Sequence, residues 1–484
     1  MGLLGIVVGL ALLIALAYRG WSILLLAPLA ALVAAGFSRQ PLLASWTQVF
    51  MPNAAGFFAQ YFPLFLLGAL FGKLMEETGS ISVISRVLME KLGKQHAIAA
   101  VVLAGALVTY GGVSLFVAFF VIAPMAEDLF RQAGIPRRLM PAAIVLGTST
   151  FTMSAMPGTP SIQNAIPMPV FGTTPFAAPG LGIIASLIMV GFGLWWLARQ
   201  EGAARSRSEG FGEKRSPSAA GIVDDPTLRE HASAAREFDP AEINRGKGAG
   251  SEPSFLAAAA PLAAVIAGNM LLSLVILPKI DADFLGEDRW GATSISAVAG
   301  VWAVITALAA GIVLALALNL RRLPRLRDTI DAGVNASVLP AISVSSLVGF
   351  GAVMAAMPAF ALVREWVLGI GGGPAVSLAV ATNILSALTG SASGGLTIAL
   401  DALGSTFIVR AAEAGVDLSL LHRVAVISSG TLDTLPHNGA VITLLAVCGT
   451  GHRESYRDIA IVSICGALLA LVAILLLGSL FGSF

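Results

Sequence analysis

Two ionisable side chains stand close together in an apolar stretch near the carboxyl end of the chain. Asp433 and His437 are four residues apart within the run 420–449. On a continuous helix they would share a face, although Pro436 interrupts that geometry. Ionisable groups inside a membrane are costly and commonly relay protons, and histidine titrates near neutral pH. We therefore expect Asp433 and His437 to carry a coupling proton. The alternative is a structural hydrogen bond that steadies the break.

A second polar interruption lies in the apolar run 139–170. Residues 156–164 contain two prolines and a glycine, which disrupt a helix and release backbone carbonyls and amides from their usual partners. Released N–H groups at a helix N-terminus suit a carboxylate. Thr159, Ser161 and Asn164 stand beside them, so we expect these three to bind an anionic substrate. The alternative is a kink whose polar groups are satisfied by neighbouring helices.

Further hydroxyl and amide groups accompany glycines at two other interruptions. Residues 389–395 include Ser391 and Ser393, and residues 109–114 include Thr109 and Ser114. Glycine permits a close approach of the backbone to a ligand, but it equally permits a plain tight turn. We assign Ser391 and Ser393 to the substrate site, together with two residues of the later break, Thr431 and Asn438. Asp401 lies further along the same run, and polar protein surroundings are enough to explain it.

The elements that position these residues are membrane spans. The chain has 484 residues, of which 56% are hydrophobic and only 12% charged. A soluble protein would carry roughly a quarter charged residues, whereas a spanning helix needs about 20 apolar residues. Apolar runs occupy residues 1–17, 21–37, 53–73, 97–130, 139–170, 179–198, 253–278, 293–319, 335–357, 374–412, 420–449 and 457–482.

Lysine and arginine set the expected orientation. The polar stretch 199–252 is predicted to be a cytoplasmic linker, because positively charged loops favour the cytoplasmic side. Alternation outward from it works only if the runs 97–130 and 374–412 are re-entrant hairpins. The predicted organisation is therefore an N-terminal repeat (1–198), the linker (199–252) and a C-terminal repeat (253–484).

The two predicted repeats have the same order of elements and opposite orientation. Each has three spans, a re-entrant hairpin, a broken span (139–170 or 420–449) and a final span. The expected fold is an all-α membrane protein of two inverted repeats. Paired broken helices in inverted repeats are typical of secondary transporters that bind their cargo near the middle of the bilayer.

Other classes of function lack their usual signals in the sequence. A phosphate-binding loop and a His-Glu-x-x-His zinc motif are both absent, and the two cysteines lie in apolar runs. The formal net charge is only +1, which gives no indication of a nucleic-acid partner. We expect no cofactor, no metal and no catalytic residue. We also expect no lysine or arginine at either break, so that a bound carboxylate would depend on helix dipoles and hydrogen bonds.

At its two broken spans the sequence resembles the gluconate permease family of the ion transporter superfamily. The resemblance is carried by residues 157–167, 171–180, 390–395 and 428–439, and it extends over the whole chain apart from the linker. It implies import of gluconate or related hydroxy acids together with protons. It also implies a homodimer in a bacterial inner membrane, with the hairpins and broken spans moving against a fixed scaffold in an elevator motion. The linker is longer and more charged than this family suggests.

The sequence therefore predicts a proton-coupled symporter of gluconate or a related small hydroxy-carboxylate. Sodium coupling is an alternative, but the Ser-Asn-Thr tips of sodium-coupled relatives are missing here. An intramembrane serine hydrolase using Ser393 and His437 is a further alternative, although the Gly-x-Ser-x-Gly spacing is absent. A channel would be indicated by flux that does not saturate with substrate.

Overall fold

The structure, a computed structural model, describes residues 2–18, 21–212, 229–230, 239–242, 251–436 and 438–484. Within these residues the regular structure is helical. Seven helices are long and apolar enough to cross a membrane, or eight if the bent pair Ser80–Leu92 and Lys94–Tyr110 is counted as one span. The chain is thus a multi-pass membrane protein, as its composition predicts.

The amino-terminal half begins with two apolar helices, α1 (Gly2–Tyr18) and α2 (Ile23–Phe37). The third helix starts with α3 (Leu42–Ala44) and a π-helical turn (Ser45–Phe50), which continue into α4 (Met51–Glu77). The remaining helices of this half are α5 (Ser80–Leu92), α6 (Ala97–Tyr110), α7 (Leu115–Ala133), α8 (Met140–Thr148), α9 (Phe151–Ser154), α10 (Ile162–Ala165), α11 (Pro167–Phe171) and α12 (Pro179–Ser206).

The helices of the carboxyl-terminal half begin with α15. Its helices are α15 (Phe255–Leu271), α16 (Ile295–Asn319), α17 (Leu326–Ala355), α18 (Phe360–Leu368), α19 (Gly373–Thr389), α20 (Ala392–Ala414), α21 (Leu418–Thr431), α22 (Gly439–Cys448), α23 (His452–Ala460) and α24 (Gly466–Phe481). The runs 97–130 and 374–412 are each two helices that pack against one another, α6 with α7 and α19 with α20. In the runs 139–170 and 420–449 the helices also end and restart, after α9 and after α21.

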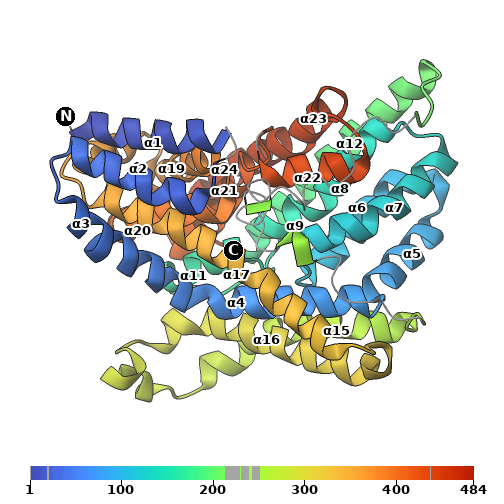
Figure 1. Cartoon of the computed structure of the whole chain (residues 1–484), viewed down its shortest axis with the longest axis horizontal. Helices are drawn as coiled ribbons and strands as arrows, with labels where there is room; N and C mark the ends of the chain where they lie inside the picture. Colours follow the sequence, from blue (N-terminus) through green and yellow to red (C-terminus); the bar gives the residue numbers. More distant parts are fainter. Residues whose placement is uncertain (1, 19–20, 213–228, 231–238, 243–250, 437) are drawn as a thin grey trace.

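The contacts between the halves are reciprocal. The long helices α4 and α17 pack on each other through the middle of the molecule (Figure 1), and the last helices α12 and α24 also pair. The second helix of each half packs on the long helix of the other half, α2 on α17 and α16 on α4. Likewise α5 packs on α15 and α18 on α1. The α15–α16 pair forms the lower edge of the molecule in Figure 1.

Glycine allows helix backbones to approach closely at several places. A Cβ atom added to Gly333 of α17 would lie 2.9 Å from the Cα of Leu70 in α4, a distance that real side chains essentially never adopt. Similarly, a Cβ on Gly147 of α8 would lie 2.3 Å from the carbonyl oxygen of Val102 in α6. Small residues let helix backbones approach closely, which is the main packing device between helices in a membrane.

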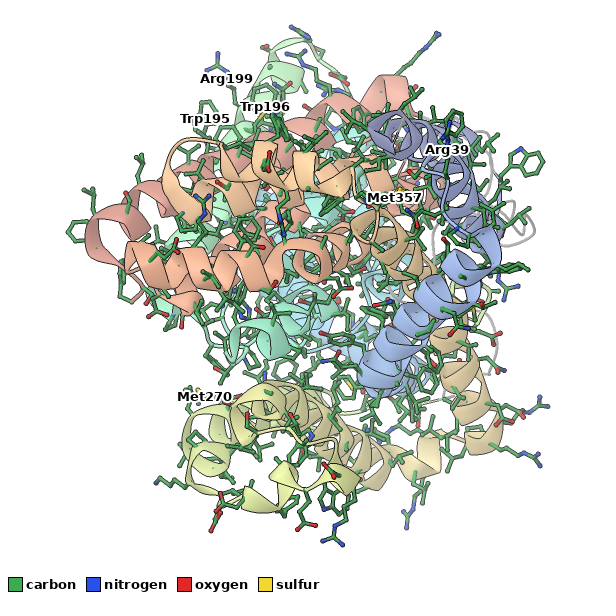
Figure 2. The ribbon with its side chains drawn as sticks, turned by 90° about the vertical axis from the view of Figure 1, so that its left-hand side faces the viewer. Arg39, Trp195, Trp196, Arg199, Met270 and Met357 are labelled. Atoms are coloured by element: carbon green, nitrogen blue, oxygen red, sulfur yellow. The ribbon has the colours of Figure 1, made fainter. Side chains whose placement is uncertain are left out.

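The last turns of α12 mark one rim of the molecule. Figure 2 shows Trp195, Trp196 and Arg199 together there, at the opposite end of the view from Met270 of α15. Trp195 is exposed, as are Arg199 and Arg205. Aromatic and basic side chains are typical of the membrane–water interface. This helix runs on to Ser206, eight residues into the segment 199–252 that the sequence predicts to be a linker.

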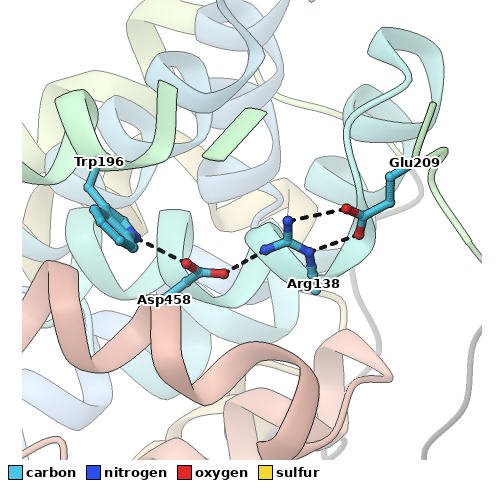
Figure 3. Close-up of polar contacts among 4 residues, drawn as sticks. All are labelled: Arg138, Trp196, Glu209 and Asp458. Atoms are coloured by element: carbon cyan, nitrogen blue, oxygen red, sulfur yellow. Dashed lines mark hydrogen bonds and ion pairs between the residues drawn. The ribbon is translucent and has the colours of Figure 1, made fainter. Parts of the chain in front are cut away.

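Residues just after α12 fold back on the same rim. Arg138 binds the carboxylate of Glu209, with N–O distances of 2.8 and 3.2 Å, and Asp458 of α23 at 2.9 Å (Figure 3). Trp196 donates to the other oxygen of Asp458 at 3.0 Å. Phe211 lies under the guanidinium of Arg137, 4.4 Å from it. The start of the predicted linker is therefore docked on the transmembrane part.

Candidate functional site

The second broken span separates α21 from α22 by residues 432–438, and Asn438 organises this break. Its Oδ1 accepts a hydrogen bond from the amide of Ala440 at 2.8 Å, which caps α22. Its Nδ2 donates to the carbonyl oxygen of Asp433 at 2.5 Å and to that of Gly390 at 3.0 Å. One side chain thus closes the break and joins it to the turn between α19 and α20.

Asp433 also connects the second break to the start of α20. Its carboxylate is 1% exposed, and Oδ1 accepts hydrogen bonds from the amide of Ala392 at 3.0 Å and from Nδ2 of Asn438 at 3.1 Å. Ala392 is the first residue of α20, so the negative charge lies at a helix N-terminus, where the helix dipole stabilises it. Asp433 therefore holds the second hairpin against the second broken span.

The two serines of the hairpin turn belong to this cluster. Ser391 caps α20 by accepting a hydrogen bond from the amide of Gly394 at 3.1 Å. The hydroxyl groups of Ser391 and Ser393 lie 3.3 Å apart, and both residues are buried. Thr431 is also buried, but its hydroxyl donates to Ile427 of its own helix at 2.9 Å. His437, the other residue predicted to carry the proton, lies outside the described residues.

The first broken span is closed by a similar hydrogen bond. Residues 155–161 separate α9 from α10, and Nδ2 of Asn164 donates to the carbonyl oxygen of Thr159 at 3.0 Å. Asn164 and Asn438 each reach the carbonyl five residues earlier in the chain, so the two breaks are closed alike. Ser161 donates to the carbonyl oxygen of Met153 at 2.8 Å, and Thr159 is 1% exposed.

A positive charge lies at this first break, contrary to the sequence-based expectation. Arg423 of α21 is fully buried and donates hydrogen bonds to three carbonyl oxygens, those of Ala155 (3.2 Å), Pro175 (3.3 Å) and Ala177 (2.7 Å). The expectation was wrong because Arg423 is distant in sequence from the residues of the first break that it contacts. A charged arginine within a predicted membrane span was the available signal.

His422 precedes Arg423 and binds the same region. Its Nε2 lies 3.1 Å from Oδ1 of Asn164, and its Nδ1 lies 2.6 Å from the hydroxyl of Thr173. His422 is fully buried. No motif in the sequence marks this histidine as part of the site. Together the two side chains attach α21, a helix of the carboxyl-terminal half, to the break of the amino-terminal half.

A cavity adjoins the first break. It is lined by Pro160 and Ser161 of the break, by Thr109 and Ser114 near the turn between α6 and α7, and by Gly68 on α4. Of the three residues predicted to bind substrate here, Ser161 reaches the cavity wall, whereas Thr159 and Asn164 do not line it. The structure therefore separates one candidate contact residue from two residues that shape the break.

The two breaks differ in the charge that is buried in them. The first holds the guanidinium of Arg423 and the second holds the carboxylate of Asp433. Arg423 makes no ion pair within the part of the chain that the structure describes, and backbone carbonyl groups together with Oδ1 of Asn164 compensate its charge there. Arg423 does not line the cavity that holds Ser161, so its charge acts there only through the break that it braces.

Comparison with known proteins agrees with this architecture. The family model of GntP family permeases matches residues 1–191. The chain is 38% identical over 483 residues to an uncharacterized transporter of Bacillus subtilis (strain 168), YxjC, and the match covers 98% of each chain.

Two solved transporter structures have a similar fold. The YdaH transporter of Alcanivorax borkumensis has a TM-score of 0.53 at 16% identity, covering 89% of this chain and 87% of that one. MtrF of Neisseria gonorrhoeae, from a class of antimetabolite efflux pumps, has a TM-score of 0.54 at 15% identity, covering 89% and 83%. At such identities these similarities concern the fold alone. The near-complete match to YxjC, together with the family model, shows that this chain is a transporter and belongs to the GntP family of permeases.

Proposed function

We propose that this transporter carries gluconate or a related small hydroxy-carboxylate together with protons. The observation that carries the proposal is the opposite charge at the two breaks. Arg423 places a buried positive charge at the first break, and Asp433 places a buried carboxylate at the second. A carrier for an anion and a proton needs a site of each kind, and family membership makes an organic acid the natural cargo.

The carboxylate is proposed to bind beside the first break. Ser161, with Thr109 and Ser114, offers hydroxyl groups to the cavity there. Thr159 and Asn164 act by shaping the break, since the amide of Asn164 closes it. Ser391 and Ser393 are proposed to contact the substrate from the second hairpin, while Thr431 and Asn438 hold that region in place.

The coupling proton is proposed to act at Asp433, with His437 as its sequence neighbour. Protonation would weaken the carboxylate as acceptor for the amide of Ala392 and for Asn438. The contact between the second hairpin and the second broken span would then loosen. The hydrogen bonds from Ala392 and Asn438 thus link the protonation state of Asp433 to the position of the α19–α20 pair.

The architecture is proposed to be two inverted repeats, residues 1–198 and 253–484, joined by the segment 199–252. The reciprocal contacts of α2 with α17 and α16 with α4 support such a relation. In this proposal α1, α2, α4, α15, α16 and α17 form a scaffold in a bacterial inner membrane. The hairpins and broken spans move against it, and the protein is a homodimer.

Two alternatives are distinguished by experiment. A hydrolase that used Ser393 as its nucleophile would lose turnover in Ser393→Ala, whereas a transporter would lose mainly affinity for its substrate. Sodium coupling is distinguished from proton coupling by measuring uptake with a sodium gradient alone and with a proton gradient alone.

The test is uptake of radiolabelled gluconate into liposomes that contain the purified protein. With sodium absent and an inward proton gradient, we expect accumulation that a protonophore abolishes. Uptake that requires sodium would overturn proton coupling. Absence of gluconate uptake under either gradient would overturn gluconate as cargo and direct the search to hydroxybutyrate and glycerate.

A further inference from the structure

A second cavity lies along α4, separate from the cavity at the first break. Its wall includes Asn53, Gln60 and Tyr61 of α4, and Thr397 and Asp401 of α20. Residues of α11 and α17 complete it. The cavity at the first break is lined by the next turns of the same helix, from Leu64 to Ala69. Both cavities therefore lie along α4, between this helix and the helices that pack on it.

Asp401 is the carboxylate of this second cavity. It is exposed at the cavity wall, and it forms no ion pair among the described residues. The other titratable residue in the wall is Tyr61 of α4, whose hydroxyl donates to the carbonyl oxygen of Ile166 at 3.1 Å. The residues that α11 and α17 contribute to the wall are apolar, Pro169 and Val170 of α11 and Val348 of α17.

These surroundings favour binding of a proton by Asp401. An ionised carboxylate at membrane depth is costly without a cation beside it. Asp433, in contrast, is 1% exposed and is held by two hydrogen-bond donors. Of these two aspartates, Asp401 is the one that a cavity makes accessible to water.

The two aspartates are connected by a single helix. Asp433 binds the amide of Ala392 at the start of α20, and Asp401 follows nine residues later on α20. That separation is about 13.5 Å along a helix axis. Thr397 lies between them, lines the cavity and donates to the carbonyl oxygen of Ser393 at 2.8 Å. A change of charge at Asp401 therefore occurs on the element whose end Asp433 holds.

We propose that Asp401 is a second proton-binding carboxylate, which exchanges the coupling proton with water through the cavity between α4, α11, α17 and α20. This inference deepens the proposed proton coupling and rests on it. Asp401 takes up or releases the proton, and Asp433 links protonation to the position of the second hairpin. Tyr61 positions the cavity wall by attaching α4 to the joint between α10 and α11 at Ile166.

The first test compares transport by Asp401→Asn, Asp401→Glu and the wild type in liposomes with radiolabelled gluconate. We expect Asp401→Asn to lose accumulation driven by a proton gradient but to retain exchange of gluconate without a gradient. Asp401→Glu should restore accumulation. Glu413→Gln is the matched control, because Glu413 is an exposed acid on the same helix and outside the cavity. Unchanged gradient-driven accumulation in Asp401→Asn would overturn the proposal.

A second test does not depend on transport. Dicyclohexylcarbodiimide reacts with protonated carboxyl groups, and mass spectrometry locates the adduct in the full-length protein. We expect an adduct at Asp401 whose yield rises as the pH falls. If the wild type fails to accumulate gluconate but this adduct forms, the proposed function fails and the proton site remains. If gluconate accumulates with protons but no pH-dependent adduct forms at Asp401, the proposal for Asp401 alone fails.

Discussion

Arg423 satisfies carbonyl oxygens that the first break leaves without helical partners. It donates to Ala155, Pro175 and Ala177, and it is fully buried. A buried acceptor that loses its donor costs about 1–3 kcal/mol, and Arg423→Gln removes most of these donors at once. We predict a clear fall in the thermal unfolding temperature of the detergent-solubilised protein. Arg410→Gln, at an exposed arginine of α20, should leave it unchanged, and equal unfolding temperatures would contradict the bracing role.

A substitution at Asp433 can test proton coupling without unfolding the protein. In Asp433→Asn an amide oxygen replaces Oδ1 and still accepts from Ala392 and Asn438, so the variant should fold. It cannot exchange a proton, so we predict that a pH gradient no longer drives gluconate accumulation. Size-exclusion chromatography checks the fold, and uptake into liposomes checks the coupling. Gradient-driven uptake equal to that of the wild type would remove Asp433 from the proton path.

Single residues of the candidate site could be predicted in part from the sequence. Asn164 and Asn438 could be identified because prolines and glycines beside them mark interruptions of apolar runs. Their partners could not be identified in this way. Arg423 meets Ala155, and Asp433 meets Ala392, only after distant segments have packed together. Hydrogen bonds across such distances leave no periodic pattern in a single sequence.

At the scale of elements, the rim where α12 ends depends on one arginine. Arg138 joins Glu209 to Asp458 (Figure 3), and the hydrogen bond to Glu209 raises the pKa of its guanidinium, so the pair persists at physiological pH. Arg138→Gln removes that charge, while the hydrogen bond from Trp196 to Asp458 remains (Figure 3). We predict faster amide hydrogen exchange in residues 207–212, measured by mass spectrometry. Arg207→Gln, an exposed neighbour, is the control, and equal exchange rates in both variants would contradict this anchoring.

The order of the apolar helices could be predicted, but two other helices could not. α5 and α18 follow the long third helix of each half, and each carries charged residues on one face. Such amphipathic segments lack the continuous apolar run that identifies a span. Their place becomes evident only from tertiary contacts, since α5 packs on α15 and α18 on α1, each in the opposite half.

At the scale of the whole molecule, a sliding motion requires that α20 move relative to α17. These helices approach closely where Gly351 faces Ile398, since a Cβ on Gly351 would lie 3.2 Å from that of Ile398. Two cysteines at these positions are near enough to form a disulfide with slight adjustment. In a background without Cys448 and Cys465, we predict that oxidation of Gly351→Cys/Ile398→Cys stops transport and that reduction restores it.

The matched control is a disulfide within the proposed scaffold. A Cβ on Gly268 of α15 would lie 3.6 Å from that of Ala307 of α16, so Gly268→Cys/Ala307→Cys should also form a bond. Because both helices belong to the scaffold in the elevator proposal, this bond should leave gluconate uptake intact. Uptake that survives the bond between α17 and α20 would mean that the two helices stay together during transport. In that case α20 would not belong to the moving domain. The coupling assigned to Asp433 would then have to act through the second broken span alone.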